Sequence, residues 1–149
     1  VKWRTRVGVP GSAGDQVEYR IITTNSSSGT PPQLYVQVED IKSGRILSSY
    51  SMGRYIRFRE PIKITDKHNN LHVLFLSSPE LYCHTTVNPA GETTSRKYHK
   101  AQGSTRPSLV AQADGSALVT NSKLYDPQQE REENNKFHNL SEIPGNFEQ

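Results

Sequence analysis

Two histidines stand at a spacing that metal sites use on helices. His68 and His72 are four residues apart, which on a helix would place two ligands on one face. The two residues between them are asparagines, which are typical of a turn, so we expect His68 in a loop and His72 on a strand. His84 and Glu80 would complete a ligand set only through contacts that the sequence does not establish. The sequence therefore predicts hydrogen-bonded or solvated histidines, no metal and no cofactor.

Nucleophilic catalysis has no recognisable signature in this chain. No serine lies in a Gly-x-Ser-x-Gly motif, which would mark a hydrolase. The single cysteine, Cys83, excludes an intramolecular disulfide and is expected as a small buried residue on a strand. The carboxylate pairs Glu39-Asp40 and Glu132-Glu133 lie beside a turn and in the C-terminal tail, where acid–base chemistry cannot be assigned to them. We expect a protein that is not an enzyme and has no catalytic residue; a hydrolase would need titratable side chains gathered in a pocket.

Basic and aromatic residues gather in three segments, Trp3–Arg6, Arg54–Arg59 and Arg96–Lys100. On a strand, alternation would place Tyr55, Arg57 and Arg59 on one face. Such a stripe binds polyanions, acidic polysaccharides among them, through charge and stacking. The candidate contacts are Trp3, Arg4, Arg6, Tyr55, Arg57 and Arg59. The alternative is that these cations are solvated and protect strand edges.

Composition limits the classes of protein that fit. The chain has 149 residues, of which 32% are apolar, enough for one ordinary domain with a thin core. It lacks an apolar run of about 18 residues, so we expect no membrane span. Residues 1–110 hold 15 Lys and Arg against 8 Asp and Glu, whereas residues 111–149 hold 3 against 7. This acidic end and the lack of a binding motif disfavour nucleic acid, and attraction between body and tail favours docking of the tail on its own body or on a neighbour.

An internal repeat organises the chain. Residues 33–38 align with residues 80–85 at an offset of 47, and Gly44 then falls on Gly91 within two turn segments. Each unit predicts four short strands joined by turns. The expected strands are 33–39, 45–51, 55–65 and 71–77 in the first unit, and 80–87, 92–99, 107–113 and 116–120 in the second. Residues 17–23 predict the last strand of a partial unit.

The domain organisation predicted is a β-repeat domain over residues 1–125 and an acidic tail over 126–149. The domain comprises a partial unit (1–32) and two units (33–79 and 80–125). Four strands in 40 to 50 residues is the size of a β-propeller blade. Because two units are too few to close a ring, three outcomes remain: several chains complete one ring, the chain is part of a longer propeller, or the strands form a small sandwich.

The segment Asn69–Leu74, followed by Tyr82-x-His84, Pro89-x-Gly91, Arg106–Val110 and Asp114-Gly115, resembles uncharacterised secreted bacterial proteins with blade-like β repeats. The resemblance covers roughly residues 1–125. It implies an all-β fold and an extracellular or periplasmic location, and it supplies no functional residue. A first residue other than Met, Val1, is consistent with a processed chain or a fragment.

The tail breaks the strand pattern. Asp126 and Pro127 predict a helix start, with Asp as the cap and Pro in the first turn, and the helix should end near Asn139. Its few apolar residues mean that it must dock or fray. The candidate anchors in the tail are Phe137, Leu140, Ile143 and Phe147.

Two functions follow as hypotheses. The first is a non-enzymatic assembly or protein-interaction subunit outside the cytoplasm, a homo-oligomer or filament that associates through its sheets and the tail. The second is a module that binds carbohydrate or another polyanion, such as an acidic glycan.

Overall fold

The computed structural model describes residues 3–9, 14–24, 31–56, 59–128 and 131. They form antiparallel sheets of four, five and two strands. The all-β class predicted from the sequence is therefore confirmed.

The first sheet is a meander in which each strand pairs with the next along the chain. Its strands are β1 Trp3–Gly8, β2 Gln16–Thr23, β3 Gln33–Asp40 and β4 Arg45–Arg54. Alternation in β3 shows why one face of this sheet forms a core: Leu34, Val36 and Val38 are fully buried. The residues between them are only partly buried, as the period of two along a strand requires.

The second sheet has five strands in the order β11-β8-β7-β6-β5. They are β5 Ile62–Thr65, β6 Leu71–Ser78, β7 Leu81–Val87, β8 Thr93–Ala101 and β11 Ser122–Tyr125. The remaining strands, β9 Ser108–Ala111 and β10 Ala117–Thr120, pair only with each other as a hairpin. We call this pair the β9–β10 hairpin.

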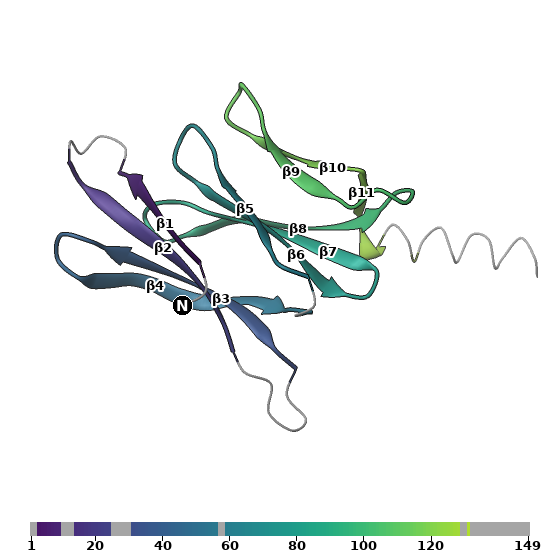
Figure 1. Ribbon diagram of the computed structural model, residues 1–149, viewed down its shortest axis with the longest axis horizontal. Coiled ribbons are helices and arrows are strands. Elements are labelled where there is room, and N and C mark those ends of the chain that lie inside the picture. Colours follow the sequence, from purple (N-terminus) through teal and green to yellow (C-terminus); the bar gives the residue numbers. More distant parts are fainter. Residues whose placement is uncertain (1–2, 10–13, 25–30, 57–58, 129–130, 132–149) are drawn as a thin grey trace, which may run out of the picture.

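The three layers are stacked in a row, with the second sheet in the middle (Figure 1). Strand β6 shows why: residues 71–76 are all buried, so both of its faces are covered. Leu71, Val73 and Phe75 pack in a cluster with first-sheet residues. Leu74 and Leu76 pack with Leu109 and Val119 of the β9–β10 hairpin and neighbouring residues. A chain with few apolar residues thus builds two cores by using both faces of one sheet.

The turns follow the sequence signals. Gly44 and Gly91, which the repeat aligned, have φ of 73° and 90°, in the region that glycine adopts without steric cost. Asn69 and Gly115 also have positive φ, 65° and 93°. The prediction that these four positions form turns is confirmed.

The predicted unit 33–79 is divided between two sheets. Its strands β3 and β4 belong to the first sheet, whereas β5 and β6 belong to the second. The next unit, 80–125, contributes β7, β8 and β11 to the second sheet and forms the β9–β10 hairpin between β8 and β11. Within the described residues the layers do not close into a ring, and the repeat itself stays a prediction.

Two local expectations have different outcomes. A strand over 55–65 is too long: among the described residues of that stretch, only Ile62–Thr65 forms a strand. The helix start at Asp126 agrees with the structure, since Pro127 and Gln128 are helical. The backbone N–H of Gln128 donates to Asp126 Oδ1 at 3.0 Å, which is the capping bond expected of Asp.

A buried tyrosine joins the first two layers. Tyr19 on β2 is almost fully buried, and its hydroxyl donates to the carbonyl oxygens of Asn69 at 2.8 Å and Val87 at 3.3 Å. Both acceptors belong to the second-sheet half of the chain. Burial, reinforced by the negative charge of Asp66, raises the pKa of Tyr19, so this hydroxyl stays protonated and serves as a donor.

The turn glycines give a matched test of the packing between these layers. A Cβ on Gly91 would lie 2.7 Å from Ser48 Oγ on β4, whereas a Cβ on Gly44 would meet no atom within 4 Å. Gly44→Ala should therefore cost about 1 kcal/mol in the free energy of unfolding from backbone strain alone. Gly91→Ala should cost at least about 1 kcal/mol more, because Ser48 must move. Urea unfolding measures both variants, and equal losses would contradict this packing.

Candidate functional site

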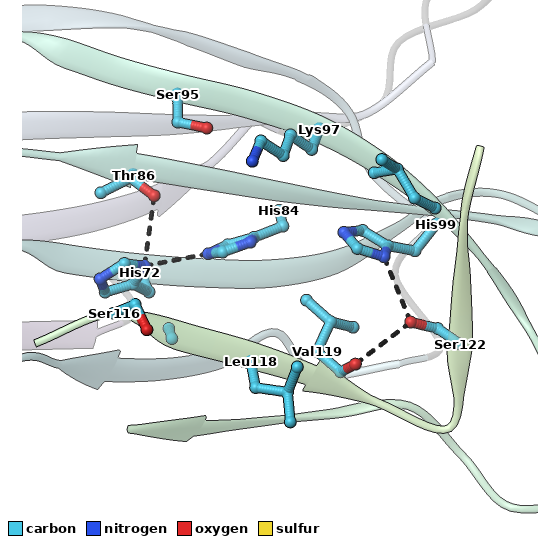
Figure 2. Close-up of a pocket in the computed structure, with 12 residues that line it drawn as sticks. His72, His84, Thr86, Ser95, Lys97, His99, Ser116, Leu118, Val119 and Ser122 are labelled. Atoms are coloured by element: carbon cyan, nitrogen blue, oxygen red, sulfur yellow. Dashed lines mark hydrogen bonds between the residues drawn. The ribbon is translucent and has the colours of Figure 1, made fainter. Parts of the chain in front are cut away.

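A pocket of about 420 Å³ lies between the second sheet and the β9–β10 hairpin (Figure 2). Its polar side chains come from strands β6, β7, β8 and β11 and from the hairpin. The polar lining residues are His72, His84, Thr86, Ser95, Lys97, His99, Ser116 and Ser122, and the apolar ones are Ala117, Leu118, Val119 and Leu124. None of the described residues that line it is acidic.

Strand alternation gathers this set on one face of the sheet. His84 and Thr86 are two apart on β7, and Lys97 and His99 are two apart on β8, so each pair shares a face. Cross-strand pairing places His84 directly opposite Lys97. Figure 2 shows the rings of His72, His84 and His99 in a row along the pocket.

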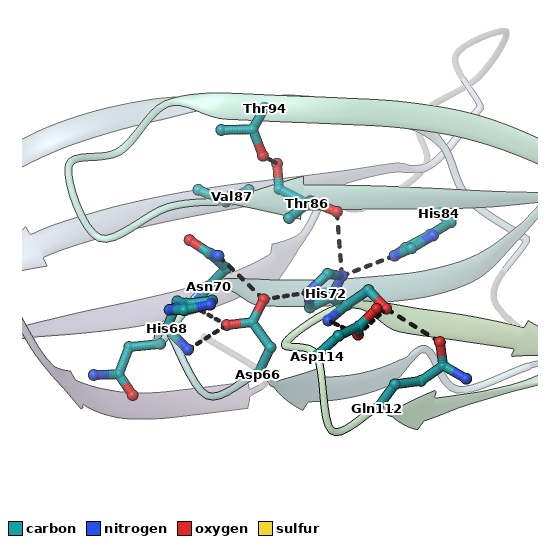
Figure 3. Close-up of polar contacts among 12 residues, drawn as sticks. Asp66, His68, Asn70, His72, His84, Thr86, Val87, Thr94, Gln112 and Asp114 are labelled. Carbon is teal, nitrogen blue, oxygen red and sulfur yellow. Dashed lines mark hydrogen bonds and ion pairs between the residues drawn. The ribbon is translucent and has the colours of Figure 1, made fainter.

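Asp66 fixes one end of this row (Figure 3). Its buried carboxylate accepts hydrogen bonds from the backbone N–H groups of His68 and Asn70, from the Asn70 side chain and from His72 Nε2. Burial alone would raise the pKa of Asp66, but the hydrogen bonds from His72, Asn70 and His68 outweigh it and lower the pKa. The carboxylate is therefore ionised at neutral pH, and it fixes the tautomer of His72 with a proton on Nε2.

The other ring nitrogen of His72 faces two groups. His72 Nδ1 lies 2.9 Å from His84 Nε2 and 3.2 Å from Thr86 Oγ1. With its proton on Nε2, a neutral His72 has a single lone pair at Nδ1, which these two donors share. When His84 donates through Nε2, its Nδ1 carries a lone pair and can accept a hydrogen bond from a ligand.

The pocket lowers the pKa of two of its imidazoles. Burial, together with electrostatic repulsion from His72, His99 and Lys97, lowers the pKa of His84 to about 4. Burial and the nearby Lys97 also lower the pKa of His99. Lys97 is exposed and has no ion-pair partner among the described residues. At neutral pH the pocket thus offers one ammonium group and, at His84 and His99, neutral rings that can donate or accept.

The far end of the row carries an unsatisfied group. His99 Nδ1 lies 3.2 Å from Ser122 Oγ, while His99 Nε2 is buried without a hydrogen-bond partner in the described structure. Ser122 Oγ is also 3.4 Å from the carbonyl oxygen of Val119, so the hydroxyl ties β11 to the hairpin. A buried nitrogen without a hydrogen-bond partner costs free energy of folding.

Asp66, His72 and Thr86 follow the carboxylate–imidazole–hydroxyl order of a hydrolytic triad. The hydroxyl is poorly placed for that chemistry, because Thr86 is only 7% exposed and shares the lone pair of His72 with His84. Among the described residues no group of His, Cys, Asp and Glu side chains could hold a metal ion. The arrangement is suited to hydrogen bonding of a ligand.

The predicted N-terminal contacts lie elsewhere. Trp3 Nε1 donates to Glu60 Oε1 at 2.9 Å. Arg4 and Arg6 lie on β1 beside the buried carboxylate of Glu18, at 4.0 and 3.3 Å. Arg20 binds the same carboxylate at 2.7 Å. These cations therefore surround an internal anion, which accounts for their clustering without any ligand.

The central stripe is not an exposed strand face. Tyr55 is 4% exposed; its ring packs edge-on against Phe75 and its hydroxyl donates to the carbonyl oxygen of Arg59. The expectation of Tyr55 on a surface stripe is wrong, because the ring fills the core between the sheets. Arg59 lines a second, separate pocket, and Arg57 lies outside the described residues. The tail anchors Phe137, Leu140, Ile143 and Phe147 also lie outside them.

The assembly of the pocket could not be predicted from the sequence. Sequence spacing grouped His72 and His84 with Glu80 and with His68, which is exposed on the turn, and it placed Lys97 in a basic surface segment. The alternation of His84 with Thr86 and of Lys97 with His99 was the available signal. The sequence does not encode the pairing of β7 with β8, which places His84 and Thr86 on the same face of the sheet as Lys97 and His99. Cys83 is fully buried on β7, as predicted.

Comparison with known proteins adds no relative: no family model, no curated protein and no solved structure matches the chain. Among the described residues there is no helix with the length and apolar character that a membrane crossing requires.

The lowered pKa of His84 makes stability depend on pH. The unfolded chain takes up a proton at His84 near pH 6.5, whereas the folded chain does so only near pH 4. The free energy of unfolding should therefore be constant above about pH 7 and fall by up to about 3 kcal/mol as the pH drops to 4. His84→Gln should flatten this dependence, leaving a residual slope from His99 and, near pH 4, from Asp66 and Glu18, whose pKa values are also lowered. Denaturant titrations between pH 4 and 7.5 measure the slope, with His68→Gln as the control; an unchanged slope in His84→Gln would contradict the assignment.

Proposed function

We propose that this protein is a binding module for a small acidic ligand, such as an acidic sugar, in the histidine-lined pocket. The observation that supports it best is the composition of the lining: an unpaired ammonium group, the neutral imidazoles of His84 and His99, and several hydroxyls, with no carboxylate among the described lining residues. A bound carboxylate would gain a charge-assisted hydrogen bond from Lys97. Sugar hydroxyls would exchange hydrogen bonds with the imidazoles and serines.

The apolar part of the lining gives the ligand a second kind of contact. Leu118 and Leu124 are 48% and 57% exposed and both line the pocket. The carbon face of a sugar ring placed against them would remove apolar surface from water. Ligand pockets commonly pair apolar walls with a few convergent polar groups. The ligand class is therefore acidic and amphipathic, and the extracytoplasmic location of this function stays a prediction.

Lys97 provides the direct test. Lys97→Gln should bind glucuronate roughly tenfold more weakly than the unaltered protein, since a hydrogen bond to a charged group contributes about 1.5 kcal/mol. Lys123→Gln is the matched control, because Lys123 lies on β11 between the pocket residues Ser122 and Leu124 and so points away from the pocket. Binding is measured by NMR titration at low and high salt, and it should weaken as salt rises. This function would be excluded if Lys97→Gln and Lys123→Gln bound glucuronate equally, or if the unaltered protein bound neutral glucose as tightly as glucuronate.

A specific observation favours self-association as a second function. Val110 and Leu118 are directly opposite each other in the β9–β10 hairpin, and they are 47% and 48% exposed. Their neighbours Leu109 and Val119 form the buried pair on the other face. The hairpin is thus apolar on both faces: one face packs on the second sheet, and the other exposes Val110 and Leu118, of which Leu118 also lines the histidine-lined pocket. A second copy of the chain is the proposed occupant, because the sheets within one copy already stack through apolar faces in this way.

Val110→Lys tests this surface without altering the pocket lining. We expect the unaltered protein to sediment as a multiple of 16.8 kDa and the variant to dissociate, because a charge would be buried at the contact. Ile46→Thr, at an exposed apolar position on β4, is the control and should leave the mass unchanged. A monomeric unaltered protein would rule out this contact. The role of the acidic tail in assembly stays a prediction.

A further inference from the structure

A second pocket, of about 360 Å³, opens on the same sheet. It lies where the chain leaves β8 and crosses to β9. Its polar lining includes Arg59, Arg106, Ser104 and Thr105, with Tyr82 at its base. As in the histidine-lined pocket, the described residues of the lining include no carboxylate. The exposed guanidinium group of Arg106 and two hydroxyls form a donor set suited to a carboxylate or sulfate.

The two pockets are neighbours across one strand pair. We call the second pocket the arginine pocket. Tyr82 lines the arginine pocket, and His99 lines the histidine-lined pocket. These two residues are directly opposite each other on β7 and β8, where paired Cβ atoms are about 5 Å apart. His84 and Lys97 continue the same face along the two strands. The two pockets therefore lie over neighbouring positions of one strand pair.

We infer that the arginine pocket is a second anion subsite and that the ligand is an acidic oligosaccharide with carboxylates or sulfates on successive units. This inference rests on the proposed function of the histidine-lined pocket. One acidic unit occupies that pocket beside Lys97, and a further unit reaches Arg106. Binding at two connected subsites increases affinity through effective concentration, without any change at either subsite.

The chemistry of the linings favours a glycan over a nucleic acid. Single-stranded nucleic acids bind by stacking bases on exposed aromatic rings. Tyr82, the one tyrosine among the described lining residues of the two pockets, is 9% exposed, and its ring packs in the cluster with Leu109 and Val119. Hydroxyls and imidazoles, which hydrogen-bond to sugar hydroxyls, are abundant instead.

The test compares a monomer with an oligomer. Glucuronate and an oligoglucuronate of four or more units are titrated against the unaltered protein, Lys97→Gln and Arg106→Gln, with Arg45→Gln, at an exposed position in the β3–β4 turn region, as the control. We expect the unaltered protein to bind the oligomer at least tenfold more tightly than the monomer. Arg106→Gln should remove most of this gain, so that the oligomer binds that variant only a few times more tightly than the monomer does. Lys97→Gln should weaken both ligands.

The outcomes separate the two proposals. If the monomer binds through Lys97 but Arg106→Gln leaves the oligomer affinity unchanged, the second subsite is wrong and the proposed function stands. If neither ligand binds, both are wrong. If a single-stranded oligonucleotide of equal charge binds as tightly as the oligoglucuronate, the surface recognises charge alone and the glycan assignment is wrong. Circular dichroism confirms that each variant is folded.

Discussion

The carboxylate of Asp66 is the constraint on which both the fold and the pocket depend. It is buried, and four donors converge on it from residues 68, 70 and 72. These bonds hold the tight turn before β6 and place Asn69 in its positive φ. The carbonyl of Asn69 then accepts the Tyr19 hydroxyl, and its side chain donates to the carbonyl of Gly8. One ionised group thus connects the packing of the first two layers to the orientation of His72 in the pocket.

A polar pocket floor can exist in so thin a core because β6 has two different faces. Leu71, Val73 and Phe75 supply the contact with the first sheet. The packing of the first sheet therefore does not involve the opposite face of β6. On that face Leu74 and Leu76 hold the hairpin, and His72 is left to hydrogen-bond. Buried polar groups are tolerated when their partners are present. Asp66, His84 and Thr86 are those partners for His72.

The sequence predicted local structure well and long-range structure poorly. The turns at Gly44 and Gly91 and the strands beside them depend on backbone preferences and alternation, which neighbouring residues encode. The division of unit 33–79 between two sheets depends on pairing between distant strands, which no local pattern encodes. The burial of Tyr55 has the same origin, because Phe75, its ring partner, is 20 positions away. The pocket could be anticipated only in part, as alternate residues on two strands whose pairing was unknown.

The distribution of charge partners explains why the basic clusters of the sequence differ in meaning. Arg4, Arg6 and Arg20 are close together because they surround the buried Glu18, and their hydrogen bonds and charges outweigh its burial and lower its pKa. Lys97 and Arg106 have no such internal anion, because the described linings of their pockets lack carboxylates. A cluster with an internal partner stabilises the fold, whereas one without a partner raises the local potential and attracts anions from solution. Net charge cannot distinguish the two cases, since only the fold decides which cations face an acid.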